Sequence, residues 1–329
     1  MFRRYFLFII LLIFMFSVAY LIKEIPREDF AEKQGILMDT YVVIRIKGVE
    51  SQKVVSKIWN LLEDLDKKLD RFKKESEIYK INNNAGKWIE VSKEVLEVIN
   101  KALYFAKISD GYFDPTVGPL MEIWGFYNSS YRLPRESEIK RALELVNWRY
   151  IDIKDNKVRL LKDKASIDLG GIAKGYAIEK ALEICRDSKI DEVYIDFGGN
   201  IAVLGKPERG DYWEIGIKHP RKDGIIGKIK IKEGVVATSG DYERYFVKNG
   251  IRYCHIMNPK NGFPASDVMS VTVISKNGIE ADALSTTFFV LGKRALDFRN
   301  KFFPDVEFVM IDKNGKIIRT SGVIFELEK

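Results

Sequence analysis

Apolar residues recur at helical spacing in six segments of the chain. This periodicity predicts helices, because side chains three and four positions apart share one helix face. Ser92 and Pro134 stand where a helix N-cap and a first helical turn favour these residue types. The predicted helices cover residues 54–72, 92–108, 134–147, 172–182, 280–291 and 293–302.

Short β-rich runs dominate the chain after Ile151, and residues 37–46 form an earlier one. Helices and antiparallel hairpins without a regular β-α-β alternation indicate an α+β architecture. Turn-forming pairs separate the later runs, namely Asp155-Asn156, Asn249-Gly250, Asn277-Gly278 and Asn314-Gly315.

The N-terminus has a different pattern. Residues 5–22 form an uncharged run rich in Phe, Leu and Ile, just long enough to cross a bilayer. Arg3 and Arg4 precede it, which predicts that this end stays in the cytoplasm and that the rest of the chain faces outward from the cytoplasmic membrane. Residues 17–19 resemble a cleavage site, so a cleaved secretory signal is the alternative to a transmembrane helix. The predicted organisation is an anchor or signal (1–22), a linker (23–34) and one domain (35–329).

Composition excludes several classes of protein. With 329 residues and 46% hydrophobic content, the chain is long and apolar enough for a globular core. Its net charge of +7 comes from scattered lysines rather than a dense basic run, so we expect no nucleic-acid partner. Cys185 and Cys254 are too few for a disulfide framework or a zinc site. Two buried thiols and a single bridge both remain open.

The segment ASIDLGGIAKGYA, residues 165–177, is the strongest local signal for chemistry. We expect a strand over residues 166–169 and a helix from Ile172, which places Asp168 at a strand-to-helix junction. Gly170 and Gly171 would let the backbone approach a ligand closely, and the helix start favours an anion. Lys174 would add a positive charge. The alternative is a tight connection in which Asp168 only caps the helix.

Five further segments occur along the chain with this junction: GYFDPTVGPL with Asp114, DFGGN with Asn200, ATSGDYERY with Ser239, HIMNPKNG with His255 and EADALSTTF with Asp282. Together the six resemble the ApbE family of flavin transferases, which move FMN from FAD onto a protein threonine. The resemblance extends from about Leu37 to the C-terminus. It implies a single ApbE-like, T-fold-like domain with antiparallel sheets and flanking helices.

The resemblance also implies a magnesium site. Asp282 and Thr286 lie one turn apart, so on a helix their oxygens share a face. In the family this pair binds Mg²⁺ with a main-chain oxygen that corresponds to Gly171, and we include Ser285 in the same set. Without the resemblance, these residues also fit an ordinary first turn of a helix whose dipole Asp282 stabilises.

FAD, the implied substrate, would contact residues from several segments. Asp168 and Asp114 could accept hydrogen bonds, and Lys174 could hold a phosphate, whereas Met38 and Phe113 could equally be core residues. We assign catalytic roles to His255 and Asp282. The implied FAD contacts are Met38, Tyr112, Phe113, Asp114, Asp168, Lys174, His255 and Ile256.

One departure from the family concerns the His255 segment, where Asn258 and Asn261 stand in place of the usual aspartate and threonine. Asparagine preserves turn geometry but removes a charge, so we expect fold and FAD binding to survive.

Three functions fit these residues. The first is Mg²⁺-dependent transfer of FMN from FAD to a threonine of a flavoprotein subunit of a membrane redox complex, with release of AMP. The second is a FAD pyrophosphatase, which uses water as acceptor at the same site. The third is a non-catalytic, membrane-anchored flavin-binding protein, which the pair Asp282 and Thr286 disfavours because storage needs no activation of phosphorus.

Overall fold

A computed structural model describes residues 30–328. The predicted anchor at residues 1–22 lies outside this part, as do residues 23–29 of the predicted linker. Within residues 30–328, no helix is both long and apolar enough to cross a bilayer.

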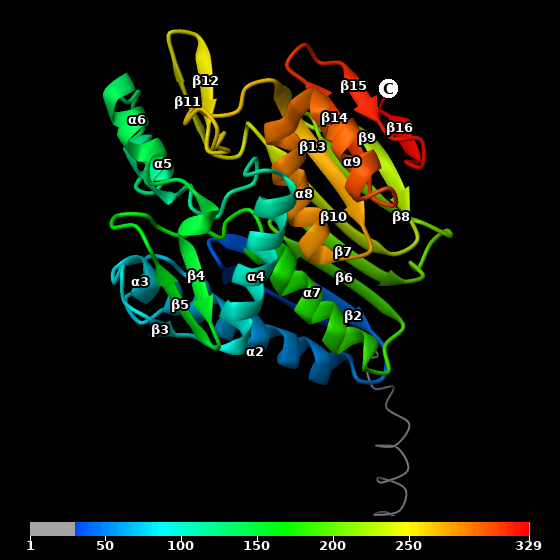
Figure 1. Cartoon of the computed structure of the whole chain (residues 1–329). Helices are drawn as coiled ribbons and strands as arrows, with labels where there is room; N and C mark the ends of the chain where they lie inside the picture. Colours follow the sequence, from blue (N-terminus) through cyan, green and yellow to red (C-terminus); the bar gives the residue numbers. More distant parts are fainter. Residues whose placement is uncertain (1–29, 329) are drawn as a thin grey trace, which may run out of the picture.

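The elements follow one another in the order predicted for an α+β chain (Figure 1). The helices are α2 (Ser51–Leu69), α3 (Glu77–Asn82), α4 (Lys93–Ile108), α5 (Gly118–Ile123), α6 (Glu136–Leu143), α7 (Ala173–Arg186), α8 (Gly278–Leu291) and α9 (Ala295–Phe302), with 3₁₀ turns η1 (Trp148–Tyr150) and η2 (Gly292–Arg294). The strands are β1 (Phe30–Leu37), β2 (Thr40–Lys47), β3 (Ile89–Glu90), β4 (Ile151–Lys154), β5 (Lys157–Leu160), β6 (Glu192–Phe197), β7 (Asn200–Gly205), β8 (Trp213–Lys218), β9 (Ile225–Ile231), β10 (Gly234–Gly240), β11 (Tyr245–Lys248), β12 (Ile251–Cys254), β13 (Val268–Ser275), β14 (Glu307–Asp312), β15 (Ile317–Arg319) and β16 (Phe325–Leu327).

A twisted antiparallel sheet of eight strands forms the centre of the domain, in the order β1-β2-β6-β7-β10-β13-β14-β15. Helices α2, α7 and α8 cover one face of it (Figure 1). Alternate residues of β10 point to opposite faces, so Val235 joins the core beneath the helices while Val236 joins the core on the other side. Helix α8 is apolar around most of its circumference because it packs between this sheet and α7.

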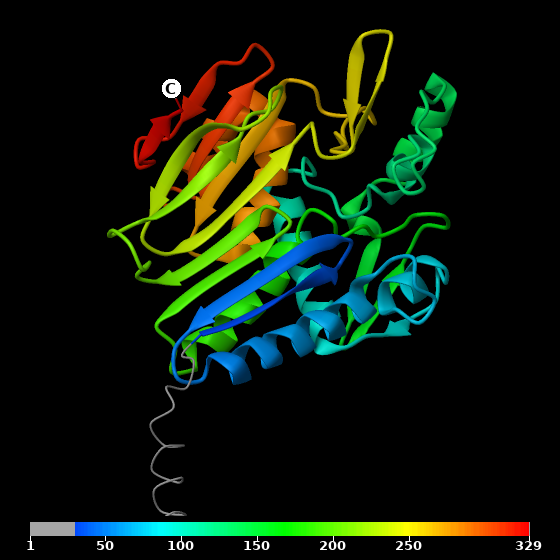
Figure 2. The same ribbon diagram turned by 180° about the vertical axis from the view of Figure 1, so that it is seen from behind.

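The small sheet β16-β9-β8 covers the second face of the large sheet (Figure 2). Ile215, Ile217 and Ile229 of this small sheet pack against Val236 and Val309 of the large one. The domain core therefore has three layers, helices, large sheet and small sheet. A third sheet, β3-β5-β4, lies beside α3 at the edge of the helical layer.

Two segments project together from one end of these layers (Figures 1 and 2). One is the pair α5 and α6, and the other is the two-stranded sheet β11-β12, which we call the β11–β12 ribbon (residues 245–254). Their contact has its own apolar cluster, in which Trp124 lies against Phe246 and Tyr253 of the ribbon. The indole of Trp124 also donates a 2.9 Å hydrogen bond to the Gly262 carbonyl.

Most predicted helices are confirmed, including the Ser92 N-cap, which accepts a hydrogen bond from the Val95 N–H. Helix α6 is shorter than the predicted 134–147, since Asn147 caps the 3₁₀ turn η1 instead. The strand predicted over residues 37–46 is confirmed for residues 40–46, which lie in β2, but not at its start. Met38 and Asp39 have φ of 50° and 57°, so they form a hairpin turn between β1 and β2. Strand β1 also includes residues 30–34, which the sequence placed in the linker.

Two further local predictions are wrong. Asn277-Gly278 does not form a hairpin turn, because the Asn277 side chain caps α8 by accepting the Glu280 N–H at 3.0 Å. Residues 166–169 form no strand. The Asn82 side chain takes the place of a neighbouring strand there, bonding the Ile167 N–H at 2.7 Å and the Ile167 carbonyl at 2.9 Å.

Both cysteines are buried free thiols, so no bridge joins them. Burial raises the pKa of Cys185 and of Cys254 to about 12, which keeps both thiols protonated and unreactive at neutral pH.

Candidate active site

The site is built where α7 and α8 cross. A Cβ on Gly175 would lie 2.3 Å from the Gly278 carbonyl oxygen, so the two helices can approach this closely only because both residues are glycine. This contact brings Asp282, in the second turn of α8, to the first turn of α7. The Asp282 carboxylate accepts the Gly175 N–H at 2.8 Å. The predicted helix start and the predicted metal ligand are therefore one structural unit.

The Asp282 carboxylate is buried, with the residue only 4% exposed. Its second oxygen accepts a 2.8 Å hydrogen bond from the Asn200 amide at the start of β7. Within residues 30–328 no Lys, Arg or His forms an ion pair with it. A buried carboxylate with two neutral hydrogen-bond donors and no cation is costly, and a bound cation would offset that cost.

A group of hydroxyls lies on the next turn of α8 and on the adjacent strand β10. Ser285 donates to the Asp282 carbonyl at 2.8 Å and lies 2.8 Å from the Ser239 hydroxyl of β10. The Thr286 hydroxyl lies 3.4 Å from Ser239. A Cβ on Gly171 would lie 3.2 Å from the same Thr286 oxygen, so this main chain faces the hydroxyl directly.

These donors fit a hard, oxygen-seeking ion better than zinc. The described residues contain no cluster of three or more His, Cys, Asp or Glu side chains suited to a metal. Magnesium keeps several waters and needs only a few protein oxygens. Asp282, Thr286, the Gly171 main chain and Ser285 are the residues that would hold it.

Asp168 lies at the same junction, with both carboxylate oxygens engaged. One accepts the Gly170 N–H at 2.7 Å, and the other accepts the Tyr127 hydroxyl at 2.5 Å and lies 3.3 Å from Arg71. Burial alone would raise the pKa of Asp168, but the Arg71 guanidinium and the hydrogen bonds from Tyr127 and Gly170 hold it below its usual range. Asp168 is therefore a fixed anion that positions the loop before α7.

His255 follows the β11–β12 ribbon and is tied to Arg244 at the other side of the ribbon's base. Its main-chain N–H and its Nδ1 lie 3.0 Å and 3.2 Å from the Arg244 carbonyl oxygen. Burial lowers the pKa of His255 to about 3, and repulsion from Arg244 and Lys174 acts in the same direction. The imidazole is therefore neutral, with Nδ1 as the donor and Nε2 free to accept.

Arg244 and Lys174 give this side of the site an excess of positive charge. Arg244 is exposed and Lys174 half-buried, and neither forms a salt bridge within the described chain. By contrast, Arg71 and Arg221 are each paired with an aspartate. Unneutralised cations beside a neutral histidine and the start of α7 suit a phosphate-bearing ligand.

The aromatic residues of the predicted FAD contacts lie on one side of this junction. Phe113 is buried, and a Cβ on Gly171 would lie 3.1 Å from its ring. Tyr112 is half-buried and accepts a 2.8 Å hydrogen bond from Arg294, whose guanidinium lies over its ring. Phe113 is therefore next to the site, whereas Tyr112 lies at its outer edge.

The remaining predicted contacts have structural partners. Asp114 accepts hydrogen bonds from Thr116 and from the Trp148 N–H at 3.0 Å, and burial raises its pKa. Met38 occupies the β1–β2 turn, where its N–H donates to Asp66 at 3.0 Å. Ile256 is buried, and its carbonyl accepts the Ala265 N–H. These contacts neither require nor exclude a ligand, so the three FAD contacts stay predictions.

Asn258 and Asn261 keep the turn geometry expected of them. The Asn258 side chain accepts the Lys260 N–H at 2.9 Å, and that of Asn261 accepts the Phe263 N–H at 3.0 Å. Both amides therefore support the loop that carries His255.

Three site residues were not predicted from the sequence. Arg71 and Tyr127 lie outside the six segments, and only the fold brings them to Asp168. Arg244 does lie in one of these segments, ATSGDYERY, where its charge could have been noticed.

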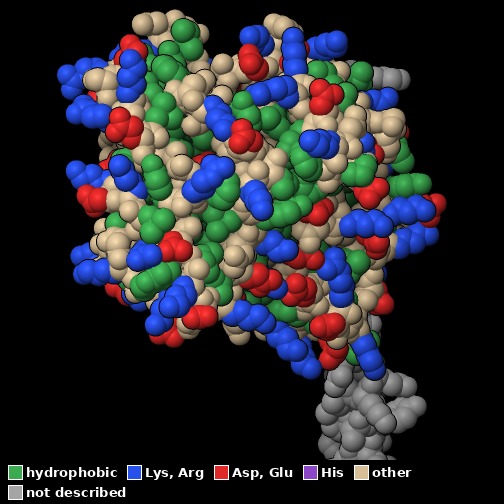
Figure 3. Space-filling view, in the orientation of Figure 1, with side chains coloured by type: hydrophobic (Ala, Val, Ile, Leu, Met, Phe, Trp, Pro, Cys, Tyr) green, Lys and Arg blue, Asp and Glu red, His purple; other side chains and the backbone are tan. Residues whose placement is uncertain are grey.

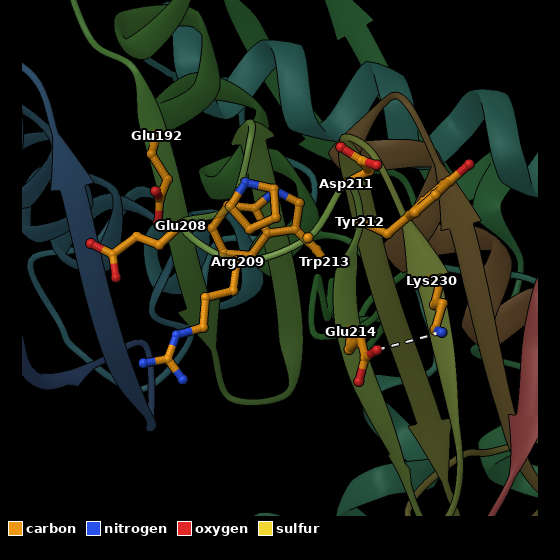
Figure 4. A pocket seen from close by; sticks show the side chains of 10 residues that line it. Glu192, Glu208, Arg209, Asp211, Tyr212, Trp213, Glu214 and Lys230 are labelled. Carbon is orange, nitrogen blue, oxygen red and sulfur yellow. Dashed lines mark ion pairs between the residues drawn. The ribbon is translucent and has the colours of Figure 1, made fainter.

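A separate hollow lies between the large sheet and the small sheet (Figure 4). Its walls carry both charges, and Lys230 lies 3.5 Å from Glu214. None of the predicted site residues lines it, so the hollow is not the candidate active site. The side chains labelled there are Glu192, Glu208, Arg209, Asp211, Tyr212, Trp213, Glu214 and Lys230.

Comparison with known proteins shows which family the chain resembles as a whole. A profile described as the ApbE family matches residues 38–310. The chain belongs to the ApbE family. Proteins named FAD:protein FMN transferase are similar to it along most of their length. That of Haemophilus influenzae is 31% identical over 84% of each chain, and that of Treponema pallidum is 28% identical over 88% of this chain and 85% of its own.

Solved ApbE structures share the fold. The ApbE protein of Thermotoga maritima superposes with a TM-score of 0.82 at 36% identity, covering 89% of this chain and 97% of that chain. The flavin transferase ApbE of Vibrio cholerae gives 0.79 at 26% identity over the same shares. The ApbE fold and the enzyme class predicted from the sequence are therefore confirmed.

We expect Arg71→Met to destabilise the protein by about 3 kcal/mol, because it leaves the Asp168 carboxylate buried without its cation. The loss should be largest at neutral pH and shrink as the pH falls and Asp168 is protonated. Urea unfolding of Arg71→Met, Asp168→Asn and the double variant measures the coupling. Strictly additive losses would show that the two side chains do not interact.

We expect His255 to remain neutral down to at least pH 5. Its native pKa lies below the unfolded value of about 6.5, so the unfolded state binds more protons in this window and stability falls as the pH falls. One such group gives a slope of up to about 1.4 kcal/mol per pH unit. Urea unfolding between pH 6.5 and 5 should show a smaller slope for His255→Gln, and NMR titration should show no imidazole protonation. Equal slopes would contradict the assignment.

Proposed function

We propose that this protein transfers FMN from FAD to a threonine hydroxyl of a flavoprotein, with Mg²⁺ as cofactor and AMP as the leaving group. The observation that carries the proposal is the buried Asp282 carboxylate, which is fixed at the first turn of α7 and has no cation partner within residues 30–328. The names of the ApbE relatives support the same type of enzyme.

The reaction forms one P–O bond and breaks another at the same phosphorus. The threonine oxygen attacks the phosphorus on the FMN side of the pyrophosphate, the bond from this phosphorus to the bridging oxygen breaks, and AMP leaves with that oxygen. Lys174 and Arg244 would bind the pyrophosphate, since charge-assisted hydrogen bonds favour phosphate oxygens. When bound, Mg²⁺ would neutralise charge that develops on the phosphoryl oxygens.

His255 would receive the proton of the attacking hydroxyl. With Nδ1 donating to the Arg244 carbonyl, Nε2 keeps a lone pair for that proton. The low pKa of His255 makes it a weak base in the free protein. A bound pyrophosphate would neutralise Arg244 and Lys174, whose repulsion contributes to this low pKa, and would therefore raise it.

The direct test incubates the protein with FAD, Mg²⁺ and a flavoprotein subunit of a membrane redox complex, the predicted acceptor. Mass spectrometry should detect an FMN adduct on threonine, and chromatography should detect an equal amount of AMP. Release of FMN and AMP without an adduct would instead show a pyrophosphatase. Unchanged FAD would leave only flavin binding.

We expect Asp282→Asn to lower turnover by about 10²-fold or more while FAD affinity changes little, because the lost charge acts mainly in the transition state.

We expect Lys174→Ala to act mainly on binding and to raise the FAD dissociation constant about tenfold. Fluorescence titration and AMP release separate the two effects.

The matched controls are Asp297→Asn and Lys276→Ala, which change exposed residues outside the site. Wild-type turnover of Asp282→Asn at limiting Mg²⁺ would overturn the metal assignment.

We also propose that the catalytic domain faces outward and is tethered by residues 1–22. The support is the uncharged run of residues 5–22 behind Arg3 and Arg4. Alkaline phosphatase fused after Lys329 should be active, whereas a fluorescent protein that matures only in the cytoplasm should stay dark. The opposite result would contradict the orientation, and release of soluble protein cut near Ala19 would contradict the tether.

A further inference from the structure

The β11–β12 ribbon exposes apolar side chains directly beside the candidate active site. Val247 is 56% exposed, Ile251 55% and Tyr245 38%. Val247 and Ile251 lie toward the tip of the ribbon, which projects away from the layered core (Figures 1 and 2), whereas Tyr245 lies at its base, opposite Cys254. Exposed apolar residues are common on protein surfaces, so the ribbon is distinguished by their position next to the site and by its charge.

The ribbon is rigid at its base although its tip is free. Phe246 and Tyr253 stack at 5.1 Å between ring centroids and pack against Trp124. Alternate residues of the strands point the other way, which leaves Tyr245 and Val247 on the opposite face together with Arg252, while Ile251 shares the face of Phe246 and Tyr253. The face away from Trp124 therefore combines two apolar side chains with Arg252, whose guanidinium lies over the Tyr245 ring.

The charge of the ribbon is unbalanced. Residues 244–254 include Arg244, Lys248 and Arg252 but no Asp or Glu. Over most of the face in Figure 3, Lys and Arg are interspersed with Asp and Glu. In the neighbouring segment around α6, by contrast, Glu136 and Glu138 form ion pairs with basic residues. No salt bridge within the described chain neutralises Arg244, Lys248 or Arg252.

The base of the ribbon is part of the site. Arg244 comes directly before β11 and His255 directly after β12, and the His255 N–H bonds the Arg244 carbonyl. A protein that binds the ribbon would therefore also place the neighbouring part of its own surface next to the reacting phosphate.

We propose that the β11–β12 ribbon is the docking surface for the acceptor protein, which offers apolar and acidic side chains around its reactive hydroxyl. This inference rests on the proposed function. The positive ribbon would attract and orient an acidic acceptor, while Val247 and Tyr245, on the face away from Trp124, would be covered on contact.

The test uses the full chain in three variants: Lys248→Glu with Arg252→Gln, Val247→Ser, and the matched control Lys301→Glu on α9. FMN-adduct formation is measured against acceptor concentration, and FAD affinity is measured on the same samples. The charge variant should raise the acceptor KM about tenfold, with a smaller salt dependence than the wild type, and Val247→Ser should raise it several-fold. FAD affinity and the Lys301→Glu kinetics should not change.

These measurements distinguish a failure of the proposed function from a failure of the proposed docking surface. If the wild type forms no adduct, the proposed function fails. If the wild type forms an adduct but the ribbon variants keep its acceptor KM, the docking surface is wrong. The alternative occupant of the ribbon is a second copy of this chain, which sedimentation tests. A wild-type dimer that Val247→Ser dissociates would assign the ribbon to contacts between copies and overturn the proposal.

Discussion

The exchange of hydrogen bonds between α7 and α8 is the constraint on which the site depends. At the Gly175–Gly278 contact, Asp282 of α8 accepts the N–H of Gly175, and Glu179 of α7 accepts the N–H of Gly278 at 2.7 Å. Each helix thus satisfies a donor near the start of the other, which would otherwise be buried without a partner. The sheet beneath fixes α8 through its apolar surface, so the position of Asp282 follows from core packing.

The two acidic residues at this junction differ in how their charge is balanced. Asp168 has Arg71 and Tyr127 and is complete within the protein. Among residues 30–328, the partners of the Asp282 carboxylate are the Gly175 N–H and the Asn200 side-chain amide. The two cations beside His255, Arg244 and Lys174, have no acidic partner in the described chain. A divalent cation at Asp282 and a pyrophosphate beside Arg244 and Lys174 would together remove both imbalances, which is why one ligand set explains both features.

Helical periodicity and caps in the sequence were sufficient to predict α2, α4, α7 and α8, because the apolar side of each helix is read directly from spacing. Hairpin and loop geometry was harder to read. Residues 37–46 look like one strand, since Met38 is apolar and nothing in its side chain reveals the positive φ. Residues 166–169 look like a strand because they form a short apolar run interrupted by Asp168, but Asn82 supplies the partner groups from far along the chain.

The candidate site likewise contains residues that the local sequence could predict and residues that it could not. Gly171, Asp282, Ser285 and Thr286 lie in two short segments, so their grouping could be predicted from local spacing together with family resemblance. Arg71 follows α2 and Tyr127 follows α5, so the two reach Asp168 from separate segments that only the tertiary fold brings together. Asp114 is the opposite case, since its motif points to a ligand while its oxygens bind Thr116 and Trp148 within the protein.

The central claim is that the α7–α8 crossing seats a divalent cation next to the pyrophosphate of FAD. Crystals of the domain grown with FAD and Mn²⁺ test it most directly, because anomalous scattering locates manganese independently of the protein phases. The account predicts one anomalous peak within coordination distance of Asp282 and Thr286, with the pyrophosphate beside Lys174 and Arg244. Manganese bound elsewhere while FAD occupies the site, or FAD bound with its pyrophosphate away from α7, would contradict it.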